Sequence, residues 1–344
     1  MPTSDRTTQM FREAAQAADV VARQLDENRA RMEEVCDVLR ELAPRVIVTC
    51  ARGSSDHAAT FAKYLIETRT GVLTSSAAPS VSSIYAAKAD LRGTVFLAIS
   101  QSGASPDLLA SIDMARKAGA CTIALVNADN SPLAAAADYT IPLCAGPEIS
   151  VAATKSYIAS LSALIHLVAN WASDHELIEA LERAPKQLAR AWELDWSPAS
   201  LQLTDVEHLY VLARGLGLGI AQEAALKLKE TCGVHAEGFS AAEVKHGPLA
   251  LVRSDFPVLL LVQNDETRAG SEALAATLLA RGAPVLTAGM RCPGAIVLPT
   301  LSAHPAIEPM LMIQSFYRMA NALSLARGLD PDRPPHLLKV TETV

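Results

Sequence analysis

The sequence lacks the features that mark secreted, membrane-spanning and nucleic-acid-binding proteins. Its 6 cysteines form no CxxC pair and no Cys/His ligand spacing, which predicts buried, reduced thiols and no metal site. No uninterrupted apolar run reaches about 18 residues and no signal peptide is evident, so we expect a cytoplasmic protein without a membrane partner. A formal net charge of −7 argues against a nucleic-acid partner, although a few N–H groups and hydroxyls can still hold a small anion.

Aromatic residues are also few, at 4% of the chain, whereas hydrophobic residues make up 50%. This composition suits closely packed helices that cover sheets, and 344 residues are enough to bury two cores. Apolar periodicity predicts a leading helix or helix pair over residues 8–42, and then alternating strands and helices. The expected strands cover residues 45–50, 72–75, 94–99, 121–126, 139–143, 208–213, 258–262, 285–288 and 295–298.

Two stretches of the sequence share the same pattern of glycine-containing motifs. Ala51-Arg52-Gly53 matches Ala213-Arg214-Gly215, Gly71-Val72 matches Gly233-Val234, and the residue numbers differ by 162 in both pairs. Each copy runs from an apolar segment through a glycine turn into a helix-length segment that glycine closes. We therefore predict two tandem α/β domains, residues 1–195 and 196–344, with ligands at the carboxyl ends of their parallel strands.

The first candidate site is the loop Ser100-Gln101-Ser102-Gly103-Ala104-Ser105, which follows a buried strand and precedes a helix. Hydroxyls, a carboxamide and a flexible glycine at a helix N-terminus make a good receptor for a phosphate monoester. Ser54 and Ser55 follow the first strand in the same way and are expected to face the same crevice. Ser105-Pro106-Asp107 also fits a capped helix start with no ligand, and this alternative stays open.

The second candidate is the set Glu223, Lys227 and Glu230, spaced i, i+4 and i+7 on one face of the second repeat helix. A carboxylate base beside an ammonium suits proton transfer next to a carbonyl, but the same spacing also fits a solvated ion-pair stripe. His246 precedes Gly247-Pro248 on an expected turn, where it is either a proton shuttle or a structural histidine.

The third candidate is Lys339, in a tail that holds three prolines after Gly328 and is expected to be non-helical. A lysine so close to the end of a chain is normally a solvated charge. If the tail folds back into a site, a desolvated and neutral amine there can form an imine with a sugar carbonyl.

Several segments together match a known family, and the match covers nearly the whole chain in order. They are SQSGAS at 100–105, EISVAATKSY from Glu148 to Tyr157, EAALKLKE from Glu223 to Glu230, EVKHGPLAL ending at Leu251, and Leu337-Leu338-Lys339. With these motifs the chain resembles the double-SIS phosphosugar isomerase/aminotransferase family, including the isomerase domains of glucosamine-6-phosphate synthase and stand-alone SIS-type glucosamine-6-phosphate deaminases. The resemblance implies two SIS domains, each a mainly parallel sheet flanked by helices in a three-layer αβα, flavodoxin-like arrangement.

The resemblance also implies roles for individual residues. Glu230 would move a proton between C1 and C2 of the sugar, and Lys227 would assist. His246 would open the sugar ring of the neighbouring subunit in a homodimer, and Lys339 would form a Schiff base with the open ketose. Six residues would bind the sugar phosphate: Ser54, Ser55, Ser100, Gln101, Ser102 and Ser105. Four more would line the pocket: Gly53, Val151, Ala153 and Glu223.

The sequence departs from the synthase at three places. Pro2 follows Met1 where the synthase has the cysteine nucleophile of its glutamine-hydrolysing domain, so we expect no ammonia from glutamine. Ala153 replaces a serine that contacts the sugar, and Ala104-Ser105 replaces Glu-Thr. The phosphate hydroxyls persist, but the sugar pocket is altered.

These observations favour a glucosamine-6-phosphate deaminase/isomerase that needs no cofactor and yields fructose 6-phosphate and ammonia. A deglycase acting on a fructosamine 6-phosphate, or an ammonia-dependent aminotransferase, would use the same site. A non-catalytic phosphosugar sensor is the alternative from another class. It would not need Glu230 or Lys339, and it predicts a fused DNA-binding module, for which the sequence has no basic helix-turn-helix-like segment.

Overall fold

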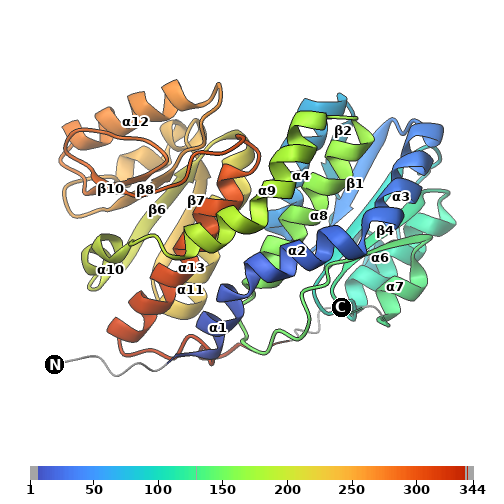
Figure 1. The fold of residues 1–344 in the computed structure, drawn as a ribbon, viewed down its shortest axis with the longest axis horizontal. Coiled ribbons are helices and arrows are strands. Elements are labelled where there is room, and N and C mark those ends of the chain that lie inside the picture. Colours follow the sequence, from blue (N-terminus) through green and yellow to red (C-terminus); the bar gives the residue numbers. More distant parts are fainter. Residues whose placement is uncertain (1–6, 129, 338, 340–344) are drawn as a thin grey trace. The chain divides into compact units, whose positions relative to one another are not determined.

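The computed structural model of the chain describes residues 7–128, 130–337 and 339, and the chain divides into two compact units (Figure 1). The N-terminal unit comprises residues 19–146 and 156–185. The C-terminal unit comprises, among the described residues, 7–18, 147–155 and 186–339. The two units are defined by contacts between residues, and each combines segments that are separate in the sequence. The boundary expected after residue 195 therefore stays a prediction.

The N-terminal unit is built on a five-stranded parallel sheet with the order β2-β1-β3-β4-β5. Its strands are β1 (Val46–Cys50), β2 (Leu73–Ser76), β3 (Val95–Ser100), β4 (Cys121–Val126) and β5 (Tyr139–Pro142). All six residues of the central strand β3 are buried, as expected for a parallel strand that is covered on both faces.

Helices cover this sheet and supply the rest of its core. They are α2 (Ala17–Glu27), α3 (Arg29–Leu42), α4 (Ser54–Thr70), α5 (Pro79–Ser83), α6 (Pro106–Lys117), α7 (Pro132–Ala136), α8 (Lys155–Trp171) and α9 (His175–Trp192). Leu108 and Ile112 on α6 belong to one buried cluster with Phe96 and Ala98 of β3. This packing fixes the start of α6 above the end of β3, where the serine loop lies.

The C-terminal unit repeats the arrangement with a parallel sheet of order β10-β9-β8-β6-β7. Its strands are β6 (His208–Ala213), β7 (His235–Ser240), β8 (Val258–Leu261), β9 (Val285–Ala288) and β10 (Ile296–Leu298). Its helices are α1 (Gln9–Ala15), α10 (Ser197–Leu203), α11 (Leu218–Cys232), α12 (Arg268–Ala280) and α13 (Glu308–Ala326), with the 3-10 turns η1 (Gly215–Gly217), η2 (Glu243–His246) and η3 (Pro248–Leu251).

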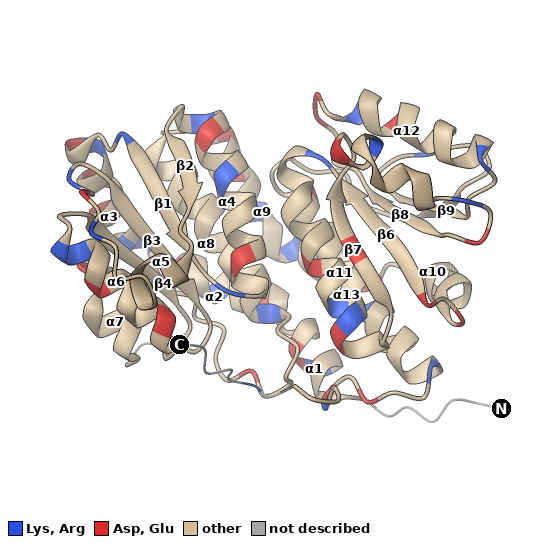
Figure 2. Ribbon diagram, turned by 180° about the vertical axis from the view of Figure 1, so that it is seen from behind, with Lys and Arg blue, Asp and Glu red and all other residues tan. Residues whose placement is uncertain are grey.

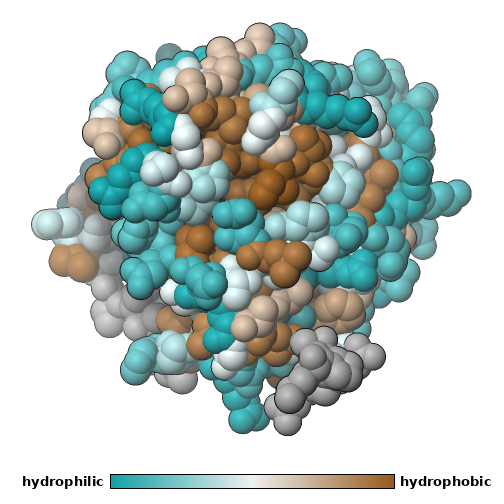
Figure 3. All heavy atoms as spheres, turned by 90° about the vertical axis from the view of Figure 1, so that its left-hand side faces the viewer, coloured by the Kyte–Doolittle hydropathy of each residue, from teal (hydrophilic) through white to brown (hydrophobic). Residues whose placement is uncertain are grey.

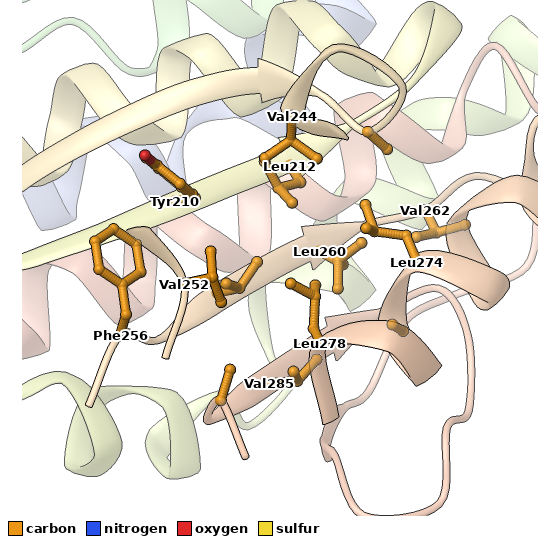
Figure 4. Packing of buried hydrophobic residues seen from close by; sticks show 14 of the residues in the cluster. Tyr210, Leu212, Val244, Val252, Phe256, Leu260, Val262, Leu274, Leu278 and Val285 are labelled. Carbon is orange, nitrogen blue, oxygen red and sulfur yellow. The ribbon is translucent and has the colours of Figure 1, made fainter. Parts of the chain in front are cut away.

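The core on one side of this second sheet is aliphatic. Leu212 of β6 and Leu260 of β8 point into the same space as Leu274 and Leu278 of α12 (Figure 4). At one end of the sheet, β10 has only three residues, and Val297 on it is 43% exposed. The face at this end of the unit carries an apolar area among polar side chains (Figure 3). Such a short edge strand offers little backbone for pairing with another chain.

The predicted fold class is confirmed, because both sheets are parallel, five-stranded and flanked by helices. The leading segment forms three consecutive helices rather than one or two. The sequence reading missed β7, whose residues HAEGFS form no apolar run. Gly238 in β7 lies against α11 so closely that an added Cβ would sit 2.8 Å from the Cα of Gln222. In the described residues, no helix is both long and apolar enough to cross a membrane.

Gly289 closes the turn after β9 where two strands come very near each other. Its φ is +88°, and an added Cβ would sit 1.8 Å from the carbonyl oxygen of Val262. We expect Gly289→Ala to lower the free energy of unfolding by about 3 kcal/mol or more, because a left-handed cost of roughly 1–2 kcal/mol is added to a backbone clash.

The matched control is Gly328→Ala in the same unit, where φ is +75° and an added Cβ meets nothing within 4 Å. This variant should lose only the roughly 1–2 kcal/mol of the backbone term. Chemical denaturation of both variants measures the difference, and equal losses would contradict the clash.

Candidate functional site

The face of α11 that carries Glu223, Lys227 and Glu230 is mostly buried. The helix ends at Gly233, which adopts a left-handed conformation with φ 62° and donates its N–H to the carbonyl of Leu228. This helix carries both acidic and basic residues (Figure 2). The side chains of Glu223 and Lys227 are 0% and 1% exposed, whereas that of Glu230 is 20% exposed. The solvated ion-pair stripe considered above is therefore wrong for this face.

Lys227 is held between the two carboxylates. Its ammonium lies 3.5 Å from Oε1 of Glu223 and donates a hydrogen bond to Oε2 of Glu230. The hydroxyl of Tyr317 on α13 donates to Glu223 at 3.1 Å. Burial alone would lower the pKa of Lys227, but the charges of Glu223 and Glu230 outweigh it and raise this pKa above its usual value. Lys227 is therefore an ammonium at neutral pH.

His246 lies at another part of the same unit. It ends η2, after the carboxyl end of β7, and its side chain is exposed. Glu230 lies near the end of α11, which precedes the amino end of β7. Because β7 has six residues, the two positions are separated by roughly 20 Å of strand. The α11 set therefore lies away from the carboxyl end of β7, and His246 of the same chain does not join it; the expectation that ligands gather at carboxyl strand ends stays a prediction.

Lys339 folds back onto the C-terminal unit. Its ammonium donates to the carbonyl of Ser150 at 2.6 Å and lies 3.9 Å from the carboxylate of Glu148. Burial lowers the pKa of Lys339, and the positive charge of Lys227 lowers it further, while Glu148 and Glu13 act in the opposite direction. The structure therefore brings Lys339 within electrostatic reach of Lys227 and Glu230, and its contacts with Ser150 and Glu148 show that the interpretation as a solvated charge is wrong.

The segment from Glu148 to Thr154 forms the loop beside Lys339. The side chain of Glu148 is fully buried and accepts the backbone N–H of Thr154 at 2.9 Å. Val151 and Ala153, both expected to line the pocket, are half-buried in this loop. The sequence reading quoted this segment as a motif but assigned no role to Glu148; its only signal was its place at the head of the motif.

The serine loop lies in the N-terminal unit at the carboxyl end of its sheet. β1 and β3 are neighbours in the sheet, so the loops that follow them are neighbours too. Ser54 and Ser55 open α4, and Arg52 just before them pairs with Asp107 of α6 at 2.8 Å. This ion pair, which the sequence reading missed, ties the two loops together. The expected grouping of Ser54 and Ser55 with the serine loop is consistent with this link.

Gly103 shapes the serine loop. Its φ is +62°, and an added Cβ would sit 2.2 Å from Oγ of Ser131. Ser100 is buried and accepts the N–H of Gly103 at 3.0 Å, whereas Gln101, Ser102 and Ser105 are half-buried. Within the described structure, Ser105 makes no side-chain capping bond to α6, although Pro106 follows it as expected. A capped turn therefore does not account for the Ser105 hydroxyl.

A separate cavity of about 180 Å³ lies at the carboxyl edge of β8 and β9 in the C-terminal unit. Its polar lining includes Asn264, Arg268 and Ser302, and it contains none of the predicted site residues. Among the residues that the structure describes, no group of three or more His, Cys, Asp or Glu side chains could hold a metal ion.

Comparison with known proteins identifies the family. A model of the SIS domain matches residues 43–169 and 202–288, so the chain belongs to the SIS domain family. Glutamine–fructose-6-phosphate aminotransferase (isomerizing) of Thermotoga maritima is 32% identical over an alignment of 325 residues, and this alignment covers 89% of this chain and 53% of that protein. The chain thus spans about half the length of the curated relatives that it matches.

Two solved structures are similar along nearly the whole chain. A Silicibacter pomeroyi protein, provisionally named a phosphosugar isomerase, is 41% identical with a TM-score of 0.91 and covers 94% of this chain and 100% of its own. The C-terminal domain of glucosamine-fructose-6-phosphate aminotransferase from Francisella tularensis is 27% identical with a TM-score of 0.88 and covers 97% of this chain and 100% of its own.

The buried ion pairs of α11 lead to a stability prediction. Lys227→Met should lower the free energy of unfolding by about 3–5 kcal/mol at neutral pH, because it leaves buried carboxylates without their cation. The raised pKa of Lys227 means that its stabilisation is complete below the unfolded-state pKa and is lost as pH rises through the folded-state value. The difference between wild type and variant should therefore shrink at strongly alkaline pH.

The matched control is Lys229→Met, two residues along the same helix at an exposed position. It should change stability by no more than about 0.5 kcal/mol. Urea denaturation at several pH values measures both variants, and a loss for Lys227→Met as small as that of the control would disprove the buried-cation role.

Proposed function

We propose that the chain is an SIS-type enzyme that converts glucosamine 6-phosphate to fructose 6-phosphate and ammonia. One observation carries this proposal: a partly exposed carboxylate, Glu230, touches the buried ammonium of Lys227, and the amine of Lys339 with its lowered pKa folds back beside them. A base, a fixed cation and an amine nucleophile are the groups that an amino sugar needs to become a ketose.

Glu230 is the proton carrier of the proposed reaction. Its 20% exposure lets it reach a substrate, whereas Glu223 and Lys227 are closed off. In the open-chain aldose, Glu230 removes the proton at C2 and returns it to C1, so the enolamine becomes a ketimine. Lys227 stabilises the negative charge that develops at the sugar oxygen.

Lys339 provides the route by which the nitrogen leaves. Its lowered pKa raises the fraction of neutral amine at neutral pH, and only this form attacks a carbon. Attack at C2 of the ketimine expels ammonia and leaves a sugar imine on Lys339. Water then hydrolyses this imine to fructose 6-phosphate and regenerates the lysine amine.

The remaining residues are proposed to bind and open the sugar. The hydroxyls and amide of the N-terminal unit, namely Ser54, Ser55, Ser100, Gln101, Ser102 and Ser105, bind its phosphate. Gly53, Val151 and Ala153 line the sugar pocket, whereas Glu223, which was expected there, is 0% exposed and holds Lys227 instead. We propose a homodimer in which His246, exposed on its turn, opens the sugar ring of the neighbouring subunit. The names of the aminotransferase relatives support the substrate class.

We expect purified protein to release ammonia and fructose 6-phosphate from glucosamine 6-phosphate without added metal or nucleotide, because Glu230, Lys227 and Lys339 supply the base, the cation and the nucleophile. An enzyme-coupled assay reads both products, with a fructosamine 6-phosphate as a parallel substrate. Loss of activity with a chelator, or a requirement for NAD, would contradict this mechanism.

A second prediction separates enzyme from sensor. Glu230→Gln keeps the side-chain shape but removes the base, so turnover should fall by about 100-fold or more while phosphosugar affinity changes little. Ser102→Ala should instead weaken phosphosugar binding by about 1–3 kcal/mol through a lost hydrogen bond to phosphate. Steady-state kinetics and calorimetry measure the two effects. Wild-type turnover in Glu230→Gln would show that Glu230 is not the base.

A further inference from the structure

The leading helix α1 carries a buried carboxylate that lies outside the proposed chemistry. Glu13 is only 1% exposed. Its Oε2 accepts the backbone N–H of Ser150 at 3.1 Å, its Oε1 accepts that of Ile149, and Gln9 donates to it from one turn earlier. Burying a carboxylate is costly unless hydrogen bonds compensate it, and here two of the donors come from one loop.

These hydrogen bonds set the direction of the peptide groups beside Lys339. Because the N–H groups of Ile149 and Ser150 point to Glu13, the backbone of this turn has little freedom, and the carbonyl of Ser150 accepts the Lys339 ammonium at 2.6 Å. At the preceding residue, the carboxylate of Glu148 is held by the N–H of Thr154. The loop that hydrogen-bonds Lys339 is therefore fixed both by Glu13 and by the hydrogen bond between Glu148 and Thr154.

The same helix also holds the tail that carries the lysine. The carboxylate of Asp332 accepts the backbone N–H groups of Gln9 and Met10 at 2.7 and 2.6 Å. Farther along α1, the amide of Gln314 on α13 donates to the carbonyl of Ala14 at 3.0 Å. The contacts thus connect three segments in a ring. Helix α1 hydrogen-bonds the loop, the loop hydrogen-bonds Lys339, and the tail that carries Lys339 hydrogen-bonds α1.

We propose that Glu13 is a positioning residue for Lys339. Glu13 fixes the Ile149–Ser150 peptide groups and thereby orients the lysine amine, and Asp332 anchors the tail that carries the lysine. We call these contacts of Glu13 and Asp332 the clamp. Glu13 does not touch the substrate; it acts through the loop. This inference rests on the proposed function in taking Lys339 as the amine that forms the sugar imine.

Glu13→Gln tests the clamp with little change in volume. A glutamine has one acceptor oxygen, so one of the two loop N–H groups loses its partner and faces an NH₂ group. Because the Lys339 amine is then wrongly oriented, kcat should fall by about 10-fold or more while KM changes little. The rate at which borohydride traps the sugar imine at Lys339 should fall by about the same factor. Peptide mass spectrometry locates the trapped sugar.

A second readout needs no sugar and should move in the opposite direction. The Glu13 charge and the Ser150 carbonyl both favour the ammonium form of Lys339, so their loss lowers its pKa further. Acetic anhydride at neutral pH should therefore label Lys339 about threefold or more faster in Glu13→Gln, relative to exposed Lys117 in the same digest. A small reagent reacts faster while the sugar reacts more slowly, a pattern that general destabilisation does not produce.

Glu308→Gln is the matched control. Glu308 is likewise a buried glutamate of the C-terminal unit that accepts two backbone N–H groups from loops, those of Asn264 and Ala303. These loops carry none of the proposed site residues, so trapping and labelling of Lys339 should stay within about twofold of wild type. If Glu13→Gln does not fold, Asp332→Asn probes the other end of the clamp and should give the same pair of changes.

The outcomes separate this inference from the proposed function. Unchanged trapping and labelling in Glu13→Gln, or equal changes in Glu308→Gln, would overturn the clamp. If the wild-type protein traps no sugar, the proposed function fails, and the labelling comparison alone then decides whether Glu13 positions Lys339.

Discussion

The chemistry proposed for this protein depends on one buried ammonium between two carboxylates. Lys227 cannot be solvated, so its charge is stable only because Glu223 and Glu230 lie on the same helix face, four residues before it and three after it. Tyr317 of α13 hydrogen-bonds Glu223 and so connects this pair to the packing of α11 against α13. Glu223 is thereby left as the structural carboxylate, and Glu230, at the edge of the buried face, is the one that can meet a substrate.

The two copies of the repeat use the same strand–turn–helix unit differently. In the N-terminal unit, the turns after β1 and β3 carry hydroxyls at the carboxyl edge of the sheet, where parallel folds usually bind anions. In the C-terminal unit, the proposed chemistry lies instead along the helix, toward its last turn. Gly238 lets the first half of α11, at Ala221 and Gln222, approach β7 closely. A shared fold unit therefore did not predict a shared site position.

Parts of the fold and of the candidate site could be predicted from the sequence where the interacting residues lie close together along the chain. Buried parallel strands such as β4 and β9 are short apolar runs between turn residues, and their predicted bounds match the structure. Periodicity alone does not indicate α10, because Pro198 interrupts the pattern, whereas proline fits the first turn of a helix. Local pattern also placed Glu223, Lys227 and Glu230 on one face, but whether that face is buried depends on α13, far away in sequence.

Longer-range contacts could not be predicted from local pattern at all. Glu13 looks like one more polar residue on an amphipathic helix, and its partner Ile149 lies 136 residues away. The residues around Lys339 fit a solvated charge equally well, since nothing in them indicates that its ammonium finds the carbonyl of Ser150. Such contacts depend on how the chain returns to α1, which periodicity does not describe.

The two lysines of the candidate site differ in the direction of their pKa shifts, and this difference agrees with their proposed roles. For Lys227, burial is outweighed by Glu223 and Glu230, so its charge stabilises the fold at every pH below its unfolded-state pKa. For Lys339, burial prevails and lowers its pKa, so ordering its charged form costs stability at neutral pH, and this cost disappears as pH rises above the unfolded-state pKa. When two neighbouring titratable groups have pKa values shifted in opposite directions by their environments, the two groups are suited to different acid–base roles. The permanent cation suits charge stabilisation and the easily neutralised amine suits attack on carbon, so exchanging the two environments would leave the site without either function.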